Sequence, residues 1–193
     1  TPNLILQVGQ ALGIHLKRTS KDPSPTVIIG KDTRISGYIL EQALSSGLCS
    51  VGVNTCLVGP LPTPGIAFLT KERKATAGVV ISASHNHYED NGIKIFSGNG
   101  IKLSEKAQDE IENLIYKNQI ELMLPTASPL GSCTRLEEAN DDYSQYLQSQ
   151  VSQELPWNQI SLALDCAHGS AYKVGPQAFQ SMGMTLHTIN NSP

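Results

Sequence analysis

Three polar loops follow apolar stretches of the sequence, and they hold most of the side chains that could do chemistry. They span residues 30–37 (GKDTRISG), 59–64 (GPLPTP) and 83–91 (ASHNHYEDN). In parallel α/β sheets, ligands bind outside the carboxyl ends of the strands, and right-handed crossovers bring successive loops to that same edge. We therefore expect these three loops to line one site.

Ser84 lies in the richest of these loops, directly before His85 and Asn86. A serine hydroxyl is a poor nucleophile unless a base, a metal ion or a phosphoryl group already on its oxygen assists it. The surrounding residues lack the G-x-S-x-G motif of hydrolases, and no glycine stands five residues before Gly30, as a nucleotide-binding P-loop requires. Taken alone, these residues favour a plain turn at Ser84, and a reactive serine is the alternative.

Two cations close to these loops each allow two interpretations. The planar fork of Arg34 suits bidentate recognition of a phosphate, but a local ion pair with Asp32 would equally stiffen the loop. Lys94 is predicted to lie in a short strand, on the face opposite Ile93 and Ile95. It is either a solvated lysine or one that faces a phosphate or transfers a proton.

The sequence contains no pattern of side chains that predicts a metal site. His87 and Glu89 could imitate a metal site, but two residues in one turn are too few to predict one. The four cysteines lack C-x-x-C spacing and form no zinc-type pattern with histidine. We therefore expect free thiols, buried or half-buried, in a reducing cytosol. They are Cys49, Cys56, Cys133 and Cys166.

The composition of the 193 residues is that of an ordinary globular protein, with 39% hydrophobic residues. Its formal net charge of −3 argues against a nucleic-acid or anionic-membrane surface. No apolar run reaches the roughly 18 to 20 residues of a transmembrane helix, and no basic signal-peptide start is present. Thr1 and Pro2 are typical of the cap and first residue of a helix, so we expect a piece of a longer protein.

The periodicity of the apolar residues predicts the elements that position these loops. Apolar runs without polar alternation, typical of strands covered on both faces, occur at 26–30, 51–58 and 77–83, and a further short strand is predicted at 93–96. Helical stripes occur at 2–17 and 39–48. A third helix is predicted to be capped by Thr63 and opened by Pro64, and a fourth to be capped by Ser104 with Leu122 on its apolar face. The predicted fold class is α/β, a mostly parallel sheet with helices on both faces.

A second βαβ pattern begins towards the C-terminal end. Residues 123–135 have no periodicity and predict a linker, and a helix follows it. Strands are then predicted at 160–164 and 185–189, with Pro176 in the first turn of the helix between them. We expect a first domain and then a linker helix with the beginning of a similar second domain, at residues 1–135 and 136–193.

Four segments carry motifs that become specific when they are taken together. They read VISASHN at 80–86 continuing as YEDNGIK at 88–94, GKDTRISG at 30–37, PTPG at 62–65 and LDCAHG at 164–169. In this order, the set resembles the active-serine loop, the G-x-D-x-R loop, the P-T-P segment and the start of the second domain of the α-D-phosphohexomutases. These enzymes have four domains, so the resemblance implies that the acidic metal loop and the sugar-selecting domain lie outside this chain.

The resemblance also implies a chemistry for the first loop. Ser84 would carry a phosphoryl group, pass it to a sugar phosphate to form a 1,6-bisphosphate, and take back the other phosphoryl group. It would also be a ligand of one Mg²⁺. By the same resemblance, Arg34 and His85 would contact the phosphoserine as catalytic residues, Asn86 would help to bind phosphate, and Lys94 would bind phosphate and transfer a proton. The variant of the serine motif is most similar to bacterial members that interconvert glucosamine 6-phosphate and glucosamine 1-phosphate, a precursor of peptidoglycan.

Several alternatives stay open at this point. One is a sibling mutase for mannose or glucose phosphates, one is a non-catalytic sugar-phosphate binder, and one is a purely structural module. His87 stands where the family usually has proline, which puts the rigidity of the serine loop in question. The expected partner is a small sugar phosphate in the cytoplasm, with no nucleic acid and no membrane, and a homodimer is left open. The piece alone is expected not to turn over.

Overall fold

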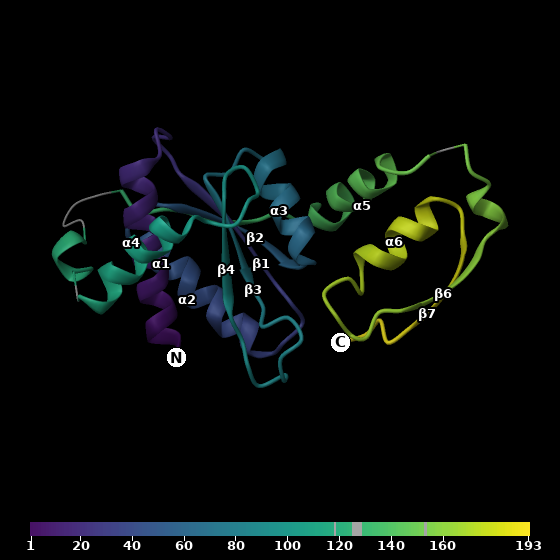
Figure 1. The fold of residues 1–193 in the computed structure, drawn as a ribbon, viewed down its shortest axis with the longest axis horizontal. Helices are drawn as coiled ribbons and strands as arrows, with labels where there is room; N and C mark the ends of the chain where they lie inside the picture. Colours follow the sequence, from purple (N-terminus) through teal and green to yellow (C-terminus); the bar gives the residue numbers. More distant parts are fainter. Residues whose placement is uncertain (118, 125–128, 153) are drawn as a thin grey trace.

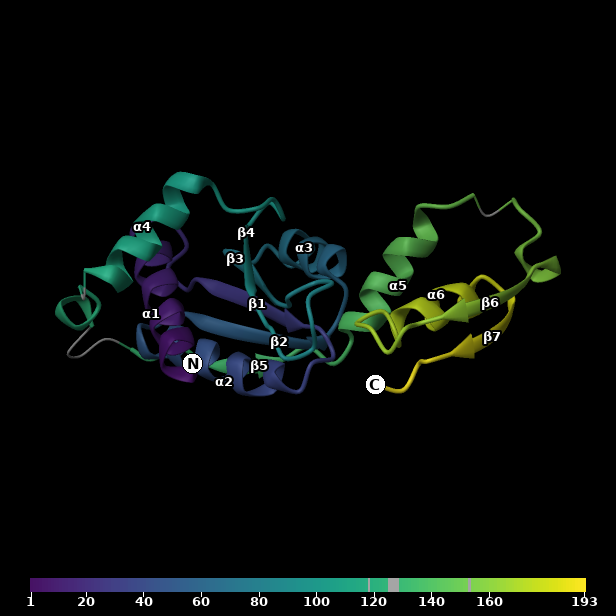
Figure 2. The same cartoon turned by 60° about the horizontal axis from the view of Figure 1, so that its bottom comes forward.

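The first sheet is built from the apolar runs of the sequence. The structure, a computed structural model, describes residues 1–117, 119–124, 129–152 and 154–193. Within them a five-stranded sheet has the order β4-β3-β1-β2-β5 (Figures 1 and 2). All neighbouring strands are parallel except β3 and β4. The strands are β1 (Thr26–Lys31), β2 (Asn54–Pro60), β3 (Ala77–Ile81), β4 (Ile93–Ser97) and β5 (Cys133–Arg135).

Helices cover both faces of this sheet, which confirms the predicted fold class. The residues of β1 alternate between two cores, because successive side chains of a strand point to opposite faces. Val27 and Ile29 pack into a core with α1 (Pro2–Thr19), α2 (Ser36–Ser50) and α4 (Glu105–Tyr116). Ile28 packs into the other core with α3 (Thr63–Glu72) and α5 (Ala139–Ser149). All five residues of β3 are buried, as expected for a strand covered on both faces.

The helix starts were predicted with mixed success. Thr1 and Ser104 are N-caps, because their hydroxyl oxygens accept from Leu4 N and Ala107 N. The predicted cap at Thr63 is wrong. The amides of residues 65 and 66 both donate to the carbonyl of Pro62, so Pro62 is the N-cap and Thr63 is already the first helical residue.

The end of α4 and the predicted linker also differ from expectation. Leu122 is not on the apolar face of α4, because that helix ends at Tyr116; Leu122 lies in a 3₁₀ turn, Glu121–Met123, and is exposed. Residues 125–128 of the predicted linker lie outside the described residues. Its last residues, Cys133–Arg135, form the edge strand β5 beside β2. Cys133 is consequently exposed, contrary to the expectation of buried or half-buried thiols; all four cysteines are free.

The second βαβ pattern is present as predicted. After a 3₁₀ turn (Trp157–Gln159), β6 (Ser161–Asp165) and β7 (Thr185–Ile189) pair in parallel in a sheet of their own. Pro176 is the third residue of the intervening α6 (Val174–Ser181), so it lies in the first turn, where it breaks no hydrogen bond. Buried Val174 joins the core formed with α3 and α5. The division at 135/136 stays a prediction. None of the helices in the described residues is long and apolar enough to cross a lipid bilayer.

Candidate active site

A cleft of about 790 Å³ opens where the expected loops meet. The loop after β1 and the loop after β3 form two of its sides, and the predicted loop 59–64 contributes Thr63, which is the first residue of α3. The opposite side of the cleft is formed by the loop after β6 and by the last two residues of the chain. It is lined by Asp32, Thr33, Arg34, Ile35, Thr63, Ser82, Ser84, His85, Asn86, Tyr88, Lys94, Ala167, His168, Gly169, Ser170, Ser192 and Pro193. The expected convergence of loops is therefore what the structure shows.

Ser84 stands at the turn of its loop in a left-handed backbone conformation, with its side chain exposed. Its φ of 56° lies in the left-handed region, which a residue with a side chain adopts at a cost of about 1–3 kcal/mol. The Ser84 amide donates to Ser82 Oγ at 3.0 Å, and the Ser84 Oγ lies 2.9 Å from His85 Nδ1. Both side chains are exposed to the cleft. A histidine nitrogen at this distance can accept the hydroxyl proton or donate to an oxygen, depending on its tautomer.

Arg34 holds this loop in place. Its side chain is largely buried, and all five of its N–H donors have acceptors. Nε donates to Asp32 at 2.9 Å, Nη1 donates to two main-chain carbonyls of the serine loop, and Nη2 donates to two more, at 3.0 and 2.9 Å. The four carbonyls are those of His87 and Asp90 on Nη1, and of Ser84 and Asn86 on Nη2. The local pair with Asp32 is therefore present, and the fork has no donor left for a phosphate.

The His87 position is held by the same contact. His87 replaces a residue that would have a fixed φ, but its carbonyl oxygen accepts from Arg34 and also from the amide of Asp90 at 3.0 Å. Its ring lies 3.5 Å from Glu89, with both side chains strongly exposed. No group of three or more His, Cys, Asp or Glu side chains within the described residues is placed to hold a metal ion. Asn86 turns towards Asp90, with its Nδ2 3.4 Å from Asp90 Oδ2.

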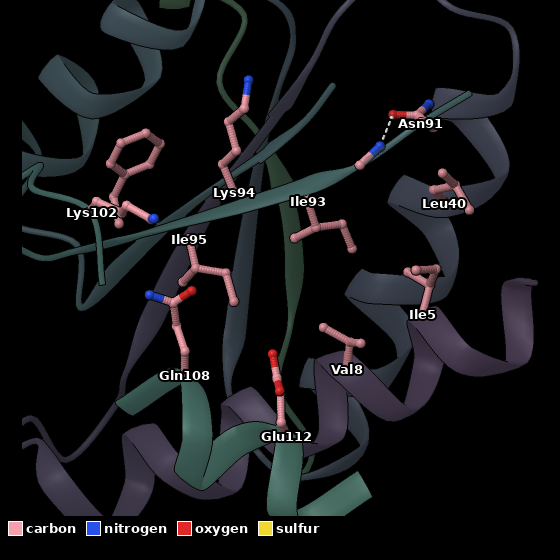
Figure 3. Close-up of a pocket in the computed structure, with 12 residues that line it drawn as sticks. Ile5, Val8, Leu40, Asn91, Ile93, Lys94, Ile95, Lys102, Gln108 and Glu112 are labelled. Atoms are coloured by element: carbon pink, nitrogen blue, oxygen red, sulfur yellow. Dashed lines mark hydrogen bonds between the residues drawn. The ribbon is translucent and has the colours of Figure 1, made fainter. Parts of the chain in front are cut away.

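Lys94 reaches the cleft from β4, where its Cα pairs with that of Val80. Figure 3 shows its side chain on the opposite side of the strand from Ile93 and Ile95, as the alternation predicted. The two isoleucines face a separate cavity of about 730 Å³ between β4, α1, α2 and α4. Lys94 is exposed, so its ammonium group is available to an anion bound beside Ser84.

The loop after β6 was missed as part of the site. Thr33 Oγ1 donates to the carbonyl of His168 at 2.7 Å, and Ala167 and His168 both have left-handed φ values, 47° and 51°. Asp165 Oδ1 accepts from the Ala167 amide at 2.8 Å and from Asn190 Nδ2 at 2.9 Å, and these two bonds lower the pKa of the carboxyl group. The signal was an aspartate at a strand end, four residues before Gly169.

The comparisons with known proteins agree with this geometry. Residues 1–121 match the family model described as phosphoglucomutase/phosphomannomutase, alpha/beta/alpha domain I. The chain belongs to this family.

Relatives within the family match the whole chain. A phosphoglucosamine mutase from Syntrophus aciditrophicus (strain SB) is 45% identical over 193 residues, all of this chain and 42% of that protein. One from Bdellovibrio bacteriovorus is 43% identical over 196 residues, all of this chain and 43% of that protein. The chain thus spans less than half the length of these curated relatives. A crystal structure of a family member from Burkholderia thailandensis superposes on the whole chain and 41% of its own, with a TM-score of 0.82 at 22% identity, which supports the fold.

Proposed function

We propose that the full-length protein is a phosphoglucosamine mutase, an isomerase that interconverts glucosamine 6-phosphate and glucosamine 1-phosphate through a phosphoserine. The observation that carries this is the exposed Ser84 Oγ, 2.9 Å from His85 Nδ1, on a loop held by Arg34 at the mouth of the cleft. Curated relatives that match all of this chain at 43–45% identity have that name. The substrate class therefore comes from the relatives, and the chemistry from the site.

In the first step of the proposed reaction, the C1 hydroxyl of glucosamine 6-phosphate attacks the phosphoryl group on Ser84. The bond between Ser84 Oγ and phosphorus breaks, the bond from the sugar oxygen forms, and glucosamine 1,6-bisphosphate results. The sugar then turns over, and its 6-phosphoryl group returns to Ser84, which leaves glucosamine 1-phosphate. Phosphoryl transfer needs in-line positioning and neutralised oxygens above all, so a loop held by Arg34 fits this task.

The other residues of the cleft would transfer protons, bind phosphate or position the serine loop. His85 would give a proton to Ser84 Oγ as the phosphoryl group departs, and take one when the group returns, because its Nδ1 lies at hydrogen-bond distance. Lys94 would bind a phosphate and exchange the proton of the sugar hydroxyl. Arg34 would position the loop and not bind phosphate itself, because all of its donors are used. Asn86, whose side chain contacts that of Asp90, would form one wall of the phosphate pocket.

The residues of this chain fit only part of a magnesium site. A phosphorylated Ser84 would offer an oxygen ligand, but the carboxylate of Asp32 already pairs with Arg34 at 2.9 Å. The described residues hold no cluster that would complete the coordination, so the remaining ligands would come from the rest of the longer protein. When bound, Mg²⁺ would neutralise the charge of about −1.5 to −2 on the phosphoserine.

A mutase for glucose or mannose phosphates is the second candidate, because the matching family model is described by those two activities. A non-catalytic binder would not need a serine held in left-handed backbone beside a histidine. The cytoplasm is the compartment we infer, in keeping with four free cysteines. A homodimer stays a prediction, and so does the inactivity of residues 1–193 alone.

The test is to purify the full-length protein and to measure by peptide mass spectrometry whether Ser84 is phosphorylated. The phosphorylated protein is then incubated separately with excess glucosamine 6-phosphate, glucose 6-phosphate and mannose 6-phosphate, with Ser84→Ala as the control. Fastest loss of the phosphoryl group and fastest turnover with the glucosamine phosphate would support the proposal. Faster reaction with another sugar phosphate would favour the second candidate, and a serine that never accepts phosphate would refute both.

A further inference from the structure

Lys31 and Glu41 form an ion pair in the protein interior, beneath the loop that carries Arg34. Lys31 is the last residue of β1, and Glu41 lies in the second turn of α2. Lys31 Nζ lies 2.5 Å from Glu41 Oε2, and the two side chains are only 1% and 4% exposed. The ring of Tyr38 covers the ammonium group, with its centroid 3.8 Å from Nζ.

Stability alone does not account for this pair. The transfer of two charges from water into the interior carries a large desolvation penalty, and an apolar pair of similar volume is often as stable or more stable. The pair is also incompletely satisfied, because Glu41 Oε1 is buried and has no hydrogen-bond partner. A buried ion pair does, however, demand one relative position of its partners, since any displacement leaves a buried charge unpaired.

The position that the pair specifies is the start of α2 relative to the end of β1. Residues 32–35 bridge these two elements. The Lys31 side chain runs under the first turn of α2, where a Cβ on Gly37 would lie 3.3 Å from Lys31 Cδ. Asp32 is fixed on the other side, because its amide donates to the carbonyl of Ile81 at 3.0 Å. Both ends of the bridge are thus anchored beside the ion pair.

Two contacts then transmit this position to the serine loop. Arg34, within the bridge, holds four carbonyls of the serine loop. Ser36, the first residue of α2, accepts from Asn91 Nδ2 at 2.9 Å, at the end of the same loop. A shift of the start of α2 would therefore move both supports of the loop together.

We propose that the Lys31–Glu41 pair positions the serine loop, acting through Arg34 and Ser36, and that it is retained for this precision. Neither residue lines the cleft, so they are positioning residues and not catalytic ones. The consequence for phosphoryl transfer rests on the proposed function. The consequence for the order of the loop does not, and it can be measured without any substrate.

The test compares three forms of the full-length protein: the wild type, Lys31→Met/Glu41→Leu, and Arg73→Gln/Asp142→Asn as a matched control. The control removes an ion pair between Arg73, the residue that follows α3, and Asp142 of α5, away from the serine loop. Amide hydrogen exchange is followed for residues 84–92, where the amides of Asn86 and Asp90 are hydrogen-bonded inside the loop. Melting temperature, kcat and KM are measured on the same samples.

We expect the apolar pair to leave the melting temperature unchanged or to raise it. Exchange in residues 84–92 should become roughly tenfold faster and kcat roughly tenfold lower at unchanged KM, because small displacements of reacting groups are costly. The control should change neither the exchange of this loop nor kcat. Wild-type exchange in the loop of a folded Lys31→Met/Glu41→Leu protein would overturn the proposal.

The test also decides the question if the double variant does not fold or if the wild type has no mutase activity. If the double variant does not fold, Glu41→Gln, which keeps the shape of the side chain, decides the question. Loop exchange that accelerates more than exchange elsewhere supports the proposal, and uniform acceleration overturns it. If the wild type has no mutase activity and Ser84 never accepts phosphate, the proposed function fails, while the exchange comparison still decides whether the ion pair orders the loop.

Discussion

Replacing Arg34 by lysine would keep the positive charge at this position and remove the planar fork. Arginine offers five N–H donors, and all five are used here, four of them on carbonyls of the serine loop. A lysine ammonium group offers three donors at a single point. At least two of the five hydrogen bonds are therefore lost in Arg34→Lys, whatever rotamer the new side chain adopts.

The size of the effect follows from the number of lost bonds. Each net hydrogen bond contributes about 0.5–1.5 kcal/mol, so two lost bonds weaken the closed loop by about 1–3 kcal/mol. That range corresponds to about 5- to 150-fold more loop opening, because about 1.4 kcal/mol is a factor of ten. The released carbonyls belong to exposed residues and can bind water, so the melting temperature should change little.

The assay measures kcat and KM of full-length Arg34→Lys and Arg34→Met, with loop exchange as a second readout. If Arg34 acts as a scaffold, both variants should lose about 10- to 100-fold in kcat at similar KM, because Ser84 is misplaced in both. If Arg34 instead bound a phosphate as a charge, Arg34→Lys would keep most of the activity and Arg34→Met would not. An Arg34→Lys enzyme with near wild-type kcat and loop exchange would refute the scaffold role.

Three further predictions concern the serine and the loop after β6. Ser84→Ala should abolish phosphorylation and lower turnover by about 10³-fold or more at unchanged fold, measured by mass spectrometry, kinetics and circular dichroism. Thr33→Val should weaken the contact with the His168 carbonyl by about 0.5–1.5 kcal/mol, seen as faster amide exchange in residues 165–170 and not in residues 84–92. The lowered pKa of Asp165 means that its hydrogen bonds stabilise the fold above the ordinary aspartate pKa and are lost as the pH falls through the lowered value. Acidification should therefore loosen residues 165–170 in the wild type, and Asp165→Asn should remove that pH dependence, as followed by NMR.

The centre of the first sheet could be predicted because β1 and β3 are buried on both faces. Such strands read as unbroken apolar runs, and β3, with all five residues buried, is the clearest of them. Short strands at an edge have no such pattern. Cys133–Arg135 is exposed along its whole length, so the sequence could not distinguish β5 from a linker.

The candidate site likewise has one part that the sequence could predict and one part that it could not. The sequence alone determined that the loops after β1 and β3 share one edge, because right-handed crossovers leave little choice, and that Lys94 faces away from Ile93 and Ile95. Only the tertiary structure decided what Arg34 binds. The pair with Asp32 was one of the two interpretations that the sequence allowed. The other four acceptors are main-chain carbonyls, which every residue has, so no pattern of side chains could predict them.

The Lys31–Glu41 pair shows the same limit. Its partners are ten residues apart, one in a strand and one in a helix, so no helical or strand periodicity connects them. The sequence determined which residues could do chemistry and on which edge of the sheet they stand, because the apolar periodicity of each element and the handedness of the connections can be read along the chain. Which acceptor each donor binds depends on how α2 packs against the sheet. Only the folded chain determines that packing.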